Sequence, residues 1–344
     1  MIRNVENVRH IVALKDMAQV VVGVLGLFSL CTNVAGQCDP GTIFLNVNPT
    51  YDVGTSPYTV AIGDLDSDSA PDLIIANRNS NNLSVLMGNG DGTFATQVTH
   101  EADGNPISIA IGDLNGDEIL DLTMSNYSND DVTVLIGNGD GTFAPQVTYG
   151  VGSMPESVAI SDLDGDGVPD LVVPNRGSDD ISILIGIGDG TFATDVTYAL
   201  GNGPTRVAIG DLNSDSVPDI VVTHHSKEGY VSVLIGNGDG TFASNISYSV
   251  GSYPLSAAIG DLDGDGVSDL VVTNWANDNV SVLINQCEFN DCPADLDGSG
   301  SVDTSDLLEL FAQWGTSGSA DFDGDGTVST VDLLILFANW GACE

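Results

Sequence analysis

The chain has 344 residues, with 49 Asp and Glu against 7 Lys and Arg, and a formal net charge of −42. This balance excludes nucleic-acid binding, because phosphate recognition needs clustered Lys and Arg. It does not indicate disorder either, since 42% of the residues are apolar and a disordered chain is poor in such residues. The carboxylates therefore need a partner, and Ca²⁺ is the expected one because it prefers carboxylate and carbonyl oxygens.

Residues 1–36 have the features of a signal peptide. Three basic residues precede an apolar run over 18–31, which is too short to span a bilayer. Val34 and Gly36 are small residues at positions −3 and −1 of a cleavage site. We expect a secreted protein, extracellular or on the cell surface, without a membrane span.

Internal repetition is the strongest pattern in the sequence. The phrase IGDLDSDSAPDLIIAN begins at Ile62, and four close copies follow at intervals of 49 or 50 residues. A second phrase, GNGDGTF, begins at Gly88 and recurs three times. Each unit has four strand-like runs separated by Asp-Gly and Asn-Gly turns, without helical periodicity. The runs of the third unit are Ala144–Tyr149, Ser157–Ile160, Leu171–Pro174 and Ile181–Ile185.

Four strands in about 49 residues is the size of one β-propeller blade. The sequence thus predicts a mainly β protein with five four-stranded blades over 37–286. The segment 38–44, CDPGTIF, is similar to GNGDGTF, and the last unit stops after 280–284. We therefore expect residues 42–52 to supply the outer strand of the last blade and close the ring. A solenoid of stacked repeats is the alternative, but it does not explain the split unit.

The exported part contains four cysteines, Cys38, Cys287, Cys292 and Cys343. An even number in an exported chain predicts two disulfides, with three possible pairings. Cys38 and Cys287 flank the one hairpin turn that is not covalently continuous. Our hypothesis is that they form a disulfide there, which leaves Cys292 and Cys343 to join the ends of the following domain.

Each copy of the first phrase contains the pattern D-x-[DN]-x-D-x-x-x-D. Side chains at alternate positions of a tight loop converge on one point, which suits a calcium site. Carboxylates so close together would repel one another strongly without a counter-ion. The five predicted ligand sets are Asp64, Asp66, Asp68 and Asp72; Asp113, Asn115, Asp117 and Asp121; Asp162, Asp164, Asp166 and Asp170; Asp211, Asn213, Asp215 and Asp219; and Asp261, Asp263, Asp265 and Asp269.

These repeated phrases resemble the FG-GAP/VCBS repeat, which occurs in the propellers of integrin α subunits and of many secreted bacterial proteins. The resemblance covers about residues 42–286 and implies a calcium-binding β-propeller in a bacterial extracellular protein. Such propellers often have seven blades, so seven is the alternative to the five predicted here. The resemblance also implies that ligands bind on the face opposite the calcium loops.

The composition changes after Cys287, where two twelve-residue acidic loops occur 26 residues apart. Each runs into a predicted amphipathic helix, over 307–314 and 333–340. The candidate ligands are Asp295, Asp297, Ser299, Asp303 and Asp306 in the first loop, and Asp321, Asp323, Asp325, Ser329 and Asp332 in the second. Residues 287–344 resemble a type I dockerin, a small α-helical domain with EF-hand-like loops. The resemblance implies a cohesin-like partner, although Thr304-Ser305 and Thr330-Val331 match the recognition pair only in part. With the propeller loops, the chain would hold up to about seven Ca²⁺.

Side chains suited to recognition follow the second strand of each unit, at the end remote from the calcium loops. They are Arg78, Tyr127, Arg176, His225 and Trp275, and the neighbouring loop adds Tyr253. Aromatic rings stack on sugar faces, and Arg pairs with carboxylates. The adjacent His224 and His225 could form a metal pair or supply a base, but neighbouring residues of a strand point to opposite faces.

The sequence contains no nucleophile elbow, P-loop, dinucleotide fingerprint or HExxH motif. The leading interpretation is a non-catalytic, calcium-binding propeller that recognises an extracellular glycan or protein and is docked by its tail. One alternative is a polysaccharide lyase or glycoside hydrolase using Arg176, His225 and Tyr127. Another is a structural spacer in an extracellular assembly.

Overall fold

The computed structural model describes residues 50–102, 104–286, 294, 296, 301–322, 326–338 and 340–342. The predicted signal peptide, the start of the predicted closing strand and the four cysteines of the predicted disulfides lie outside these residues. So do five candidate ligands of the C-terminal loops, Asp295, Asp297, Ser299, Asp323 and Asp325.

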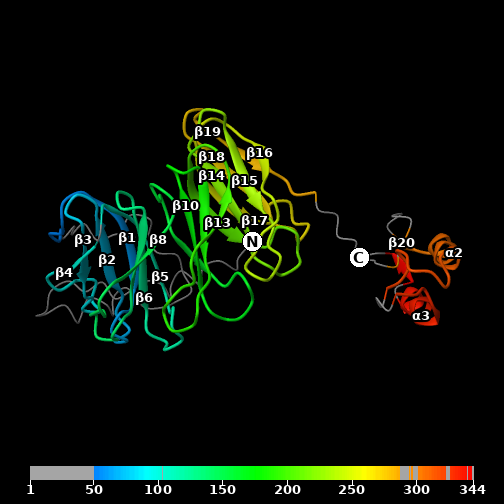
Figure 1. The fold of residues 1–344 in the computed structure, drawn as a ribbon, viewed down its shortest axis with the longest axis horizontal. Helices are drawn as coiled ribbons and strands as arrows, with labels where there is room; N and C mark the ends of the chain where they lie inside the picture. The colour runs from blue at the N-terminus through cyan, green and yellow to red at the C-terminus, as the bar shows by residue number, and fades with distance from the viewer. Residues whose placement is uncertain are drawn as a thin grey trace, which may run out of the picture. The chain divides into compact units, whose positions relative to one another are not determined.

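Five antiparallel sheets follow one another along the chain (Figure 1). Sheet 1 contains β1 (Pro57–Gly63), β2 (Asp72–Asn77), β3 (Asn82–Leu86) and β4 (Val98–Glu101). Sheet 2 contains β5 (Pro106–Gly112), β6 (Asp121–Asn126), β7 (Asp131–Leu135) and β8 (Val147–Gly150). Sheet 3 contains β9 (Ala159–Ser161), β10 (Asp170–Asn175), β11 (Asp180–Leu184) and β12 (Val196–Ala199). Sheet 4 contains β13 (Pro204–Gly210), β14 (Asp219–His224), β15 (Tyr230–Leu234) and β16 (Ile246–Ser249). Sheet 5 contains β17 (Pro254–Gly260), β18 (Asp269–Asn274) and β19 (Asn279–Leu283).

The strands of each sheet pair in sequence order, as short hairpin turns require. The second strands, such as β6 and β10, are buried along their whole length, which fits their runs of apolar and β-branched residues. The run 144–149 was predicted within the third unit, but β8 pairs with β7 and so belongs to sheet 2. Sheets 1 to 4 therefore each end with the strand that follows the GNGDGTF turn, while sheet 5 has three strands among the described residues instead of the four predicted.

Consecutive sheets pack face to face through four apolar cores. One joins sheets 1 and 2, with Ile74 and Met124 fully buried, and equivalent cores join sheets 2 and 3, 3 and 4, and 4 and 5. In sheets 2, 3 and 4, the phenylalanine of the GNGDGTF turn meets a ring on the last strand of the preceding sheet. Phe192 contacts Tyr149 edge to face at 5.5 Å, and its N–H donates to the Tyr149 hydroxyl at 3.3 Å. The prediction of a mainly β, propeller-like architecture is confirmed.

The two ends of this series of sheets differ from its interior. Val60 on β1 is 59% exposed and Val282 on β19 is 54% exposed. Their counterparts one repeat inward, Ile109 and Val233, are buried because a neighbouring sheet covers them. Tyr51 contacts Phe94 edge to face at 5.5 Å, as an outer-strand tyrosine contacts the next sheet. Closure of the ring by residues 42–52 stays a prediction, because most of that segment lies outside the described residues.

The C-terminal part contains the two-stranded pair β20 (Ser301–Val302) and β21 (Gly341–Ala342) and two helices. Helix α2 spans Thr304–Ala312 and α3 spans Thr330–Ala338. Both begin three residues earlier than predicted, because Asp303 and Asp306 form a capping box that starts α2 at Thr304. Leu310 and Leu336 are fully buried in a small shared core. In the described part of the chain, no helix combines the length and the apolar composition needed to cross a membrane.

Candidate functional site

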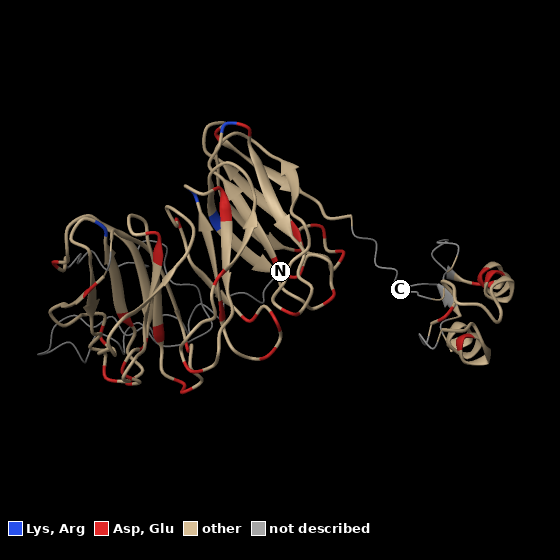
Figure 2. Cartoon of the chain, viewed as in Figure 1, with Lys and Arg blue, Asp and Glu red and all other residues tan. Residues whose placement is uncertain are grey.

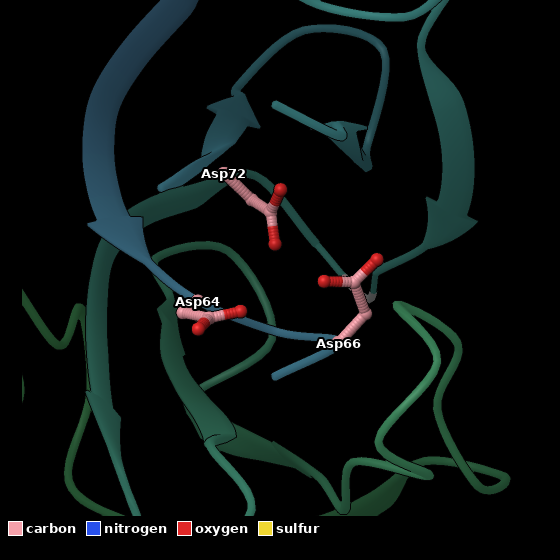
Figure 3. A group of neighbouring side chains, drawn as sticks. All are labelled: Asp64, Asp66 and Asp72. Atoms are coloured by element: carbon pink, nitrogen blue, oxygen red, sulfur yellow. The ribbon is translucent and has the colours of Figure 1, made fainter. Parts of the chain in front are cut away.

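The first acidic loop of sheet 1 gathers three carboxylates at one point. Asp64 and Asp66 lie in the loop after β1, and Asp72 is the first residue of β2 (Figure 3). Each offers one oxygen, and these oxygens lie within 4.8 Å of one another. Asp162, Asp164 and Asp170 form the same group in sheet 3, and Asp261, Asp263 and Asp265 form one in sheet 5. Three carboxylates at this spacing suit a hard cation such as Ca²⁺.

The aspartate at the ninth position also has a role that the sequence analysis missed. In sheet 1 the Oδ2 of Asp72 accepts the Leu65 N–H at 2.8 Å, and its Oδ1 accepts the Gly88 N–H at 2.7 Å. It therefore ties the acidic loop to the next hairpin. The same two bonds recur at Asp121, Asp170, Asp219 and Asp269. Recurrence at a fixed spacing was the available signal.

We call the ninth-position aspartate of each loop the clamp residue. Burial disfavours the charged form of its carboxyl. Asp170 is fully buried, and its burial raises the pKa of its carboxyl to about 6. Burial also raises the pKa of Asp121 and of Asp219. A bound cation would favour the charged form of each group. The clamp carboxylates thus fit both the scaffold and a metal site.

The loops of sheets 2 and 4 differ, because asparagine occupies their third position. The Nδ2 of Asn115 donates to Asp117 at 3.0 Å, and that of Asn213 donates to Asp215 at 2.9 Å. An amide donor takes a place that the other loops give to a carboxylate. Among the described residues, three-carboxylate groups therefore form in sheets 1, 3 and 5, while the predicted sets with Asn115 and Asn213 do not form one.

The described ligands of the C-terminal loops lie around the helix starts. Asp306 and Asp332 are buried and accept backbone N–H groups, from Leu296 at 2.6 Å and from Phe322 at 2.6 Å. Asp321 accepts the Gly326 N–H through Oδ2, while its buried Oδ1 has no hydrogen-bond partner among the described residues. A buried carboxylate oxygen without a donor is the kind of group that a cation satisfies.

One hydrogen bond holds the predicted recognition residues in equivalent places at the other ends of the sheets. The backbone N–H of each donates to the carbonyl of the residue that precedes the first strand or its proline. These bonds are Arg78 to Ser56 (3.0 Å), Tyr127 to Asn105 (3.2 Å), Arg176 to Met154 (3.0 Å), His225 to Gly203 (2.9 Å) and Trp275 to Tyr253 (3.1 Å). The five residues thus occupy one equivalent backbone position of their repeats, while ligand binding by their side chains stays a prediction.

The few basic residues lie at or near one end of the sheets, together with acidic residues such as Glu156 and Asp179. Arg78, Arg176, Arg206 and Lys227 are all the Lys and Arg in this part of the chain. Figure 2 shows these basic residues toward the ends opposite those where most acidic turns lie. We call these ends, with their five recognition residues, the recognition end.

Three rings meet at the recognition end of sheets 4 and 5. His225 lies 5.1 Å from Tyr253 and 6.0 Å from Trp275, and the two larger rings are 6.1 Å apart and nearly perpendicular. Trp275 is 64% exposed. Tyr253 has φ 55°, an uncommon conformation for a bulky residue, and the equivalent residue of sheet 4 is Gly203. The three side chains form an aromatic cluster in which Trp275 is exposed and His225 and Tyr253 are partly buried.

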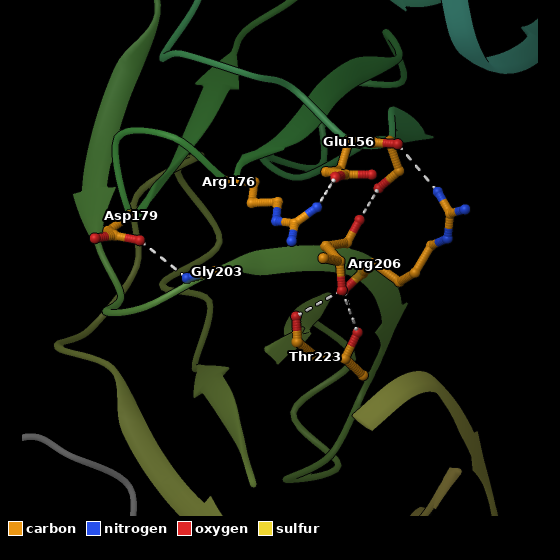
Figure 4. A network of polar contacts seen from close by, with 8 residues as sticks. Glu156, Arg176, Asp179, Gly203, Arg206 and Thr223 are labelled. Carbon is orange, nitrogen blue, oxygen red and sulfur yellow. Dashed lines mark hydrogen bonds and ion pairs between the residues drawn. The ribbon is translucent and has the colours of Figure 1, made fainter. Parts of the chain in front are cut away.

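Arg176 and Arg206 both contact Glu156 (Figure 4). The Nη1 of Arg176 lies 3.0 Å from Glu156 Oε1, and the Nη1 of Arg206 donates to the Glu156 carbonyl at 3.0 Å. Burial, together with the nearby Arg176, lowers the pKa of His225. Its imidazole is therefore neutral near pH 7, which favours ring stacking over ion pairing.

Arg78 has a different environment from Arg176. Its guanidinium carbon lies 5.5 Å from the centre of the Tyr58 ring and 5.4 Å from that of Tyr127. These distances fall within the range of cation–π attraction. Sequence reasoning missed Tyr58 and Glu156, although they occupy the same position two repeats apart.

His224 is buried and does not join His225 in a metal pair. Its Nε2 contacts the Ser232 hydroxyl at 2.9 Å, its Nδ1 contacts the Asn202 carbonyl at 3.2 Å, and its ring stacks on Tyr230. Burial lowers the pKa of His224 to about 4. Asparagine fills this position in the other four sheets, so His224 replaces a structural residue.

The comparison with protein families agrees with this repeat structure. A model described as "FG-GAP-like repeat" matches residues 64–124, 117–173, 162–222 and 217–272. These ranges cover more than half of the chain, and the chain belongs to this family. No curated protein matches it significantly in sequence.

Solved structures with similar folds have low sequence identity to this chain. A putative 6-phosphogluconolactonase from Bacteroides uniformis has 15% identity and a TM-score of 0.51, over 67% of this chain and 66% of that one. A lectin from Agrocybe aegerita, described as recognising non-reducing terminal N-acetylglucosamine, has 20% identity and a TM-score of 0.44, over 68% and 67%. The alignment thus spans about two thirds of each, and the first similarity supports the fold alone.

Proposed function

We propose that this protein is a secreted, calcium-binding propeller that recognises an extracellular glycan through its recognition end. The observation that carries the proposal is the cluster of His225, Tyr253 and Trp275. Trp275 is largely exposed and is held by the backbone bond to Tyr253. Aromatic faces stack on the apolar faces of sugar rings, so a preformed cluster of rings with polar edges suits a saccharide.

Affinity electrophoresis of residues 37–344 through gels containing neutral or acidic polysaccharides tests this proposal. We expect one glycan to retard the protein in calcium, and Trp275→Ala to abolish the retardation. Tyr248→Ala is the matched control, because Tyr248 is a half-exposed aromatic residue on the outer strand β16, away from the cluster. Retardation that survives Trp275→Ala contradicts the proposed site. Binding of a protein and of no glycan would show that the ligand is a protein.

Calcium is the second part of the proposal. Three groups of close carboxylates support cation binding at the acidic loops. Isothermal titration of the metal-free chain with CaCl₂ measures the sites, and Asp66→Asn should remove the contribution of the loop in sheet 1. Equal stoichiometry for that variant and the parent chain contradicts the assignment.

The third part of the proposal is that the C-terminal part of the chain docks the protein to a partner. Both helices and the residues directly after them carry exposed apolar side chains at equivalent positions, 26 residues apart. These are Leu308 and Phe311 in α2 with Trp314 after it, and Leu334 and Phe337 in α3 with Trp340 after it. An exposed apolar surface of this kind favours a protein partner. Pull-down with a cohesin domain as probe should retain the full chain and not Phe311→Asp with Phe337→Asp.

The enzymatic alternative differs from binding in its products. The described contacts place Tyr127 with Arg78, and His225 with Tyr253 and Trp275. A lyase would leave unsaturated ends and a hydrolase new reducing ends. We expect neither after prolonged incubation with the bound glycan, and either product would favour the enzyme.

A further inference from the structure

We propose that Arg78, set between Tyr58 and Tyr127, binds the carboxylate of an acidic sugar. This inference rests on the proposed glycan recognition and names its substrate class. The site lies in sheets 1 and 2 and is separate from the aromatic cluster of sheets 4 and 5. We call it the Arg78 site.

Sheet 3 shows what a carboxylate does at this place in the fold. Arg176 and Arg78 are equivalent residues of their repeats, held by the same backbone hydrogen bond. Glu156 occupies the equivalent position to Tyr58. In sheet 3 the glutamate places its Oε1 3.0 Å from the guanidinium of Arg176, with only 12% of the glutamate side chain exposed. The sheet therefore contains a built-in carboxylate contact.

Sheet 1 keeps the arginine and lacks that carboxylate. Arg176 with Glu156 is the single ion pair of the described residues, so Arg78 has no acidic partner among them. Two tyrosine rings lie within cation–π distance of its guanidinium carbon instead. A cation–π contact uses none of the guanidinium N–H groups, which project in its plane. Those N–H groups can donate two parallel hydrogen bonds to a carboxylate from outside.

The Arg78 site is remote from the acidic metal loop of its own sheet, whereas Asp130 and Asp131 follow Tyr127 in the neighbouring hairpin. Arg78 follows β2, whose other end begins at the metal-loop residue Asp72. Six residues of strand separate the two by about 20 Å, which is more than twice the screening length of about 8 Å at physiological salt. Tyr58 is 50% exposed, so a ligand can reach the site and contact a ring as well.

Oligogalacturonate is the probe, and its carboxyl-reduced form is the matched neutral ligand. We expect the wild-type chain to bind the acid about tenfold more tightly than the reduced form, as charge-assisted bidentate hydrogen bonds allow. Arg78→Gln should remove this preference. Tyr58→Glu should remove it too, because it recreates the internal ion pair of sheet 3 and occupies the guanidinium.

Lys227→Gln serves as the control, because Lys227 is an exposed basic residue in the loop after β14 and is not part of the Arg78 site. This variant should leave the preference unchanged. Glu156→Tyr should strengthen binding of the acid, because it frees Arg176. Near-UV circular dichroism checks that each variant is folded.

The outcomes separate this inference from the function on which it rests. Binding of the neutral form with the same affinity as the acid, or a preference that survives Arg78→Gln, overturns the Arg78 site and leaves glycan recognition standing. Failure of the wild type to bind either form overturns the Arg78 site, while the electrophoresis with other polysaccharides decides whether glycan recognition stands. Binding of an acidic peptide in place of the saccharide overturns the ligand class.

Discussion

The two ends of each sheet use the repeat in opposite ways. At the acidic end, the same aspartate accepts the same two backbone N–H groups in all five sheets. At the recognition end, one backbone hydrogen bond recurs while the side chain that it positions changes from Arg to Tyr, His and Trp. The repeat thus fixes the backbone at both ends, and side-chain variety is confined to the end where no buried carboxylate has to be satisfied.

Removal of calcium should have the largest effect on stability. Only the acidic ends of the sheets, where the metal loops lie, should lose contacts directly. At about 1 mM calcium and the dissociation constants usual for extracellular modules, each site adds about 0.4–1.4 kcal/mol of stability. We expect an excess of EDTA to lower the melting temperature by about 10 °C or more, because several loops contribute. Differential scanning calorimetry checks this, and an unchanged melt would contradict metal binding.

Replacement of a clamp residue distinguishes the stability that comes from its backbone hydrogen bonds from the stability that comes from bound calcium. Asp72→Ala leaves the N–H groups of Leu65 and Gly88 without their acceptor, so we expect a loss of about 2–4 kcal/mol in the free energy of unfolding. Asp66→Ala removes a candidate ligand without touching the clamp. Urea unfolding should show the first loss with or without calcium and the second only with it. Equal behaviour of the two variants would refute the distinction.

The buried His224 should make stability depend on pH. Burial lowers its pKa to about 4 in the folded chain, against about 6.5 in the unfolded chain. The unfolded chain therefore takes up the proton first as the pH falls, and the contribution of His224, present in full above about pH 6.5, is lost toward pH 4. The loss is on the order of 3 kcal/mol at most.

Asparagine, which occupies this position in the other four sheets, gives the matched variant. The free energy of unfolding, measured with urea, should fall more steeply between pH 7 and pH 4 for the parent chain than for His224→Asn. Parallel curves would mean that His224 takes up its proton in the folded chain as readily as in the unfolded one.

The smallest effect on stability is expected at Tyr253, where the effect on binding is large. Glycine relieves a backbone conformation that costs about 1–3 kcal/mol for a non-glycine residue, and this offsets the lost ring contacts with His225 and Trp275. We expect Tyr253→Gly to unfold within about 1 kcal/mol of the parent chain but to lose its affinity for the glycan. A large loss of stability would assign Tyr253 to the scaffold.

Much of the architecture could be predicted from the sequence. The interval between copies of the first phrase gave five sheets, and the Asp-Gly turns gave antiparallel pairing in sequence order. The position of the recognition residues followed from register alone. The sequence did not predict which sheet the strand at 144–149 joins. The run could belong to sheet 2 or sheet 3, and its pairing with β7 places it in sheet 2.

Other features depended on three-dimensional contacts. Helix α2 begins before its apolar run because Asp303 caps it. Asn115 donates to Asp117, so the loop of sheet 2 differs from that of sheet 1 despite a shared pattern. The contacts between Arg176 and Glu156, and of Arg78 with its two tyrosines, join residues far apart in the chain.

By itself, the sequence determined the repeat, the strands, the acidic loops and the set of side chains at the recognition end. These depend on local spacing, because turn residues and alternate positions of a loop act over a few residues. Only the tertiary structure decided which side chains meet: the three rings of sheets 4 and 5, the clamp between Asp72 and the next hairpin, and the free guanidinium of Arg78. Such contacts depend on how neighbouring strands and sheets approach one another, and no spacing along a single chain encodes that.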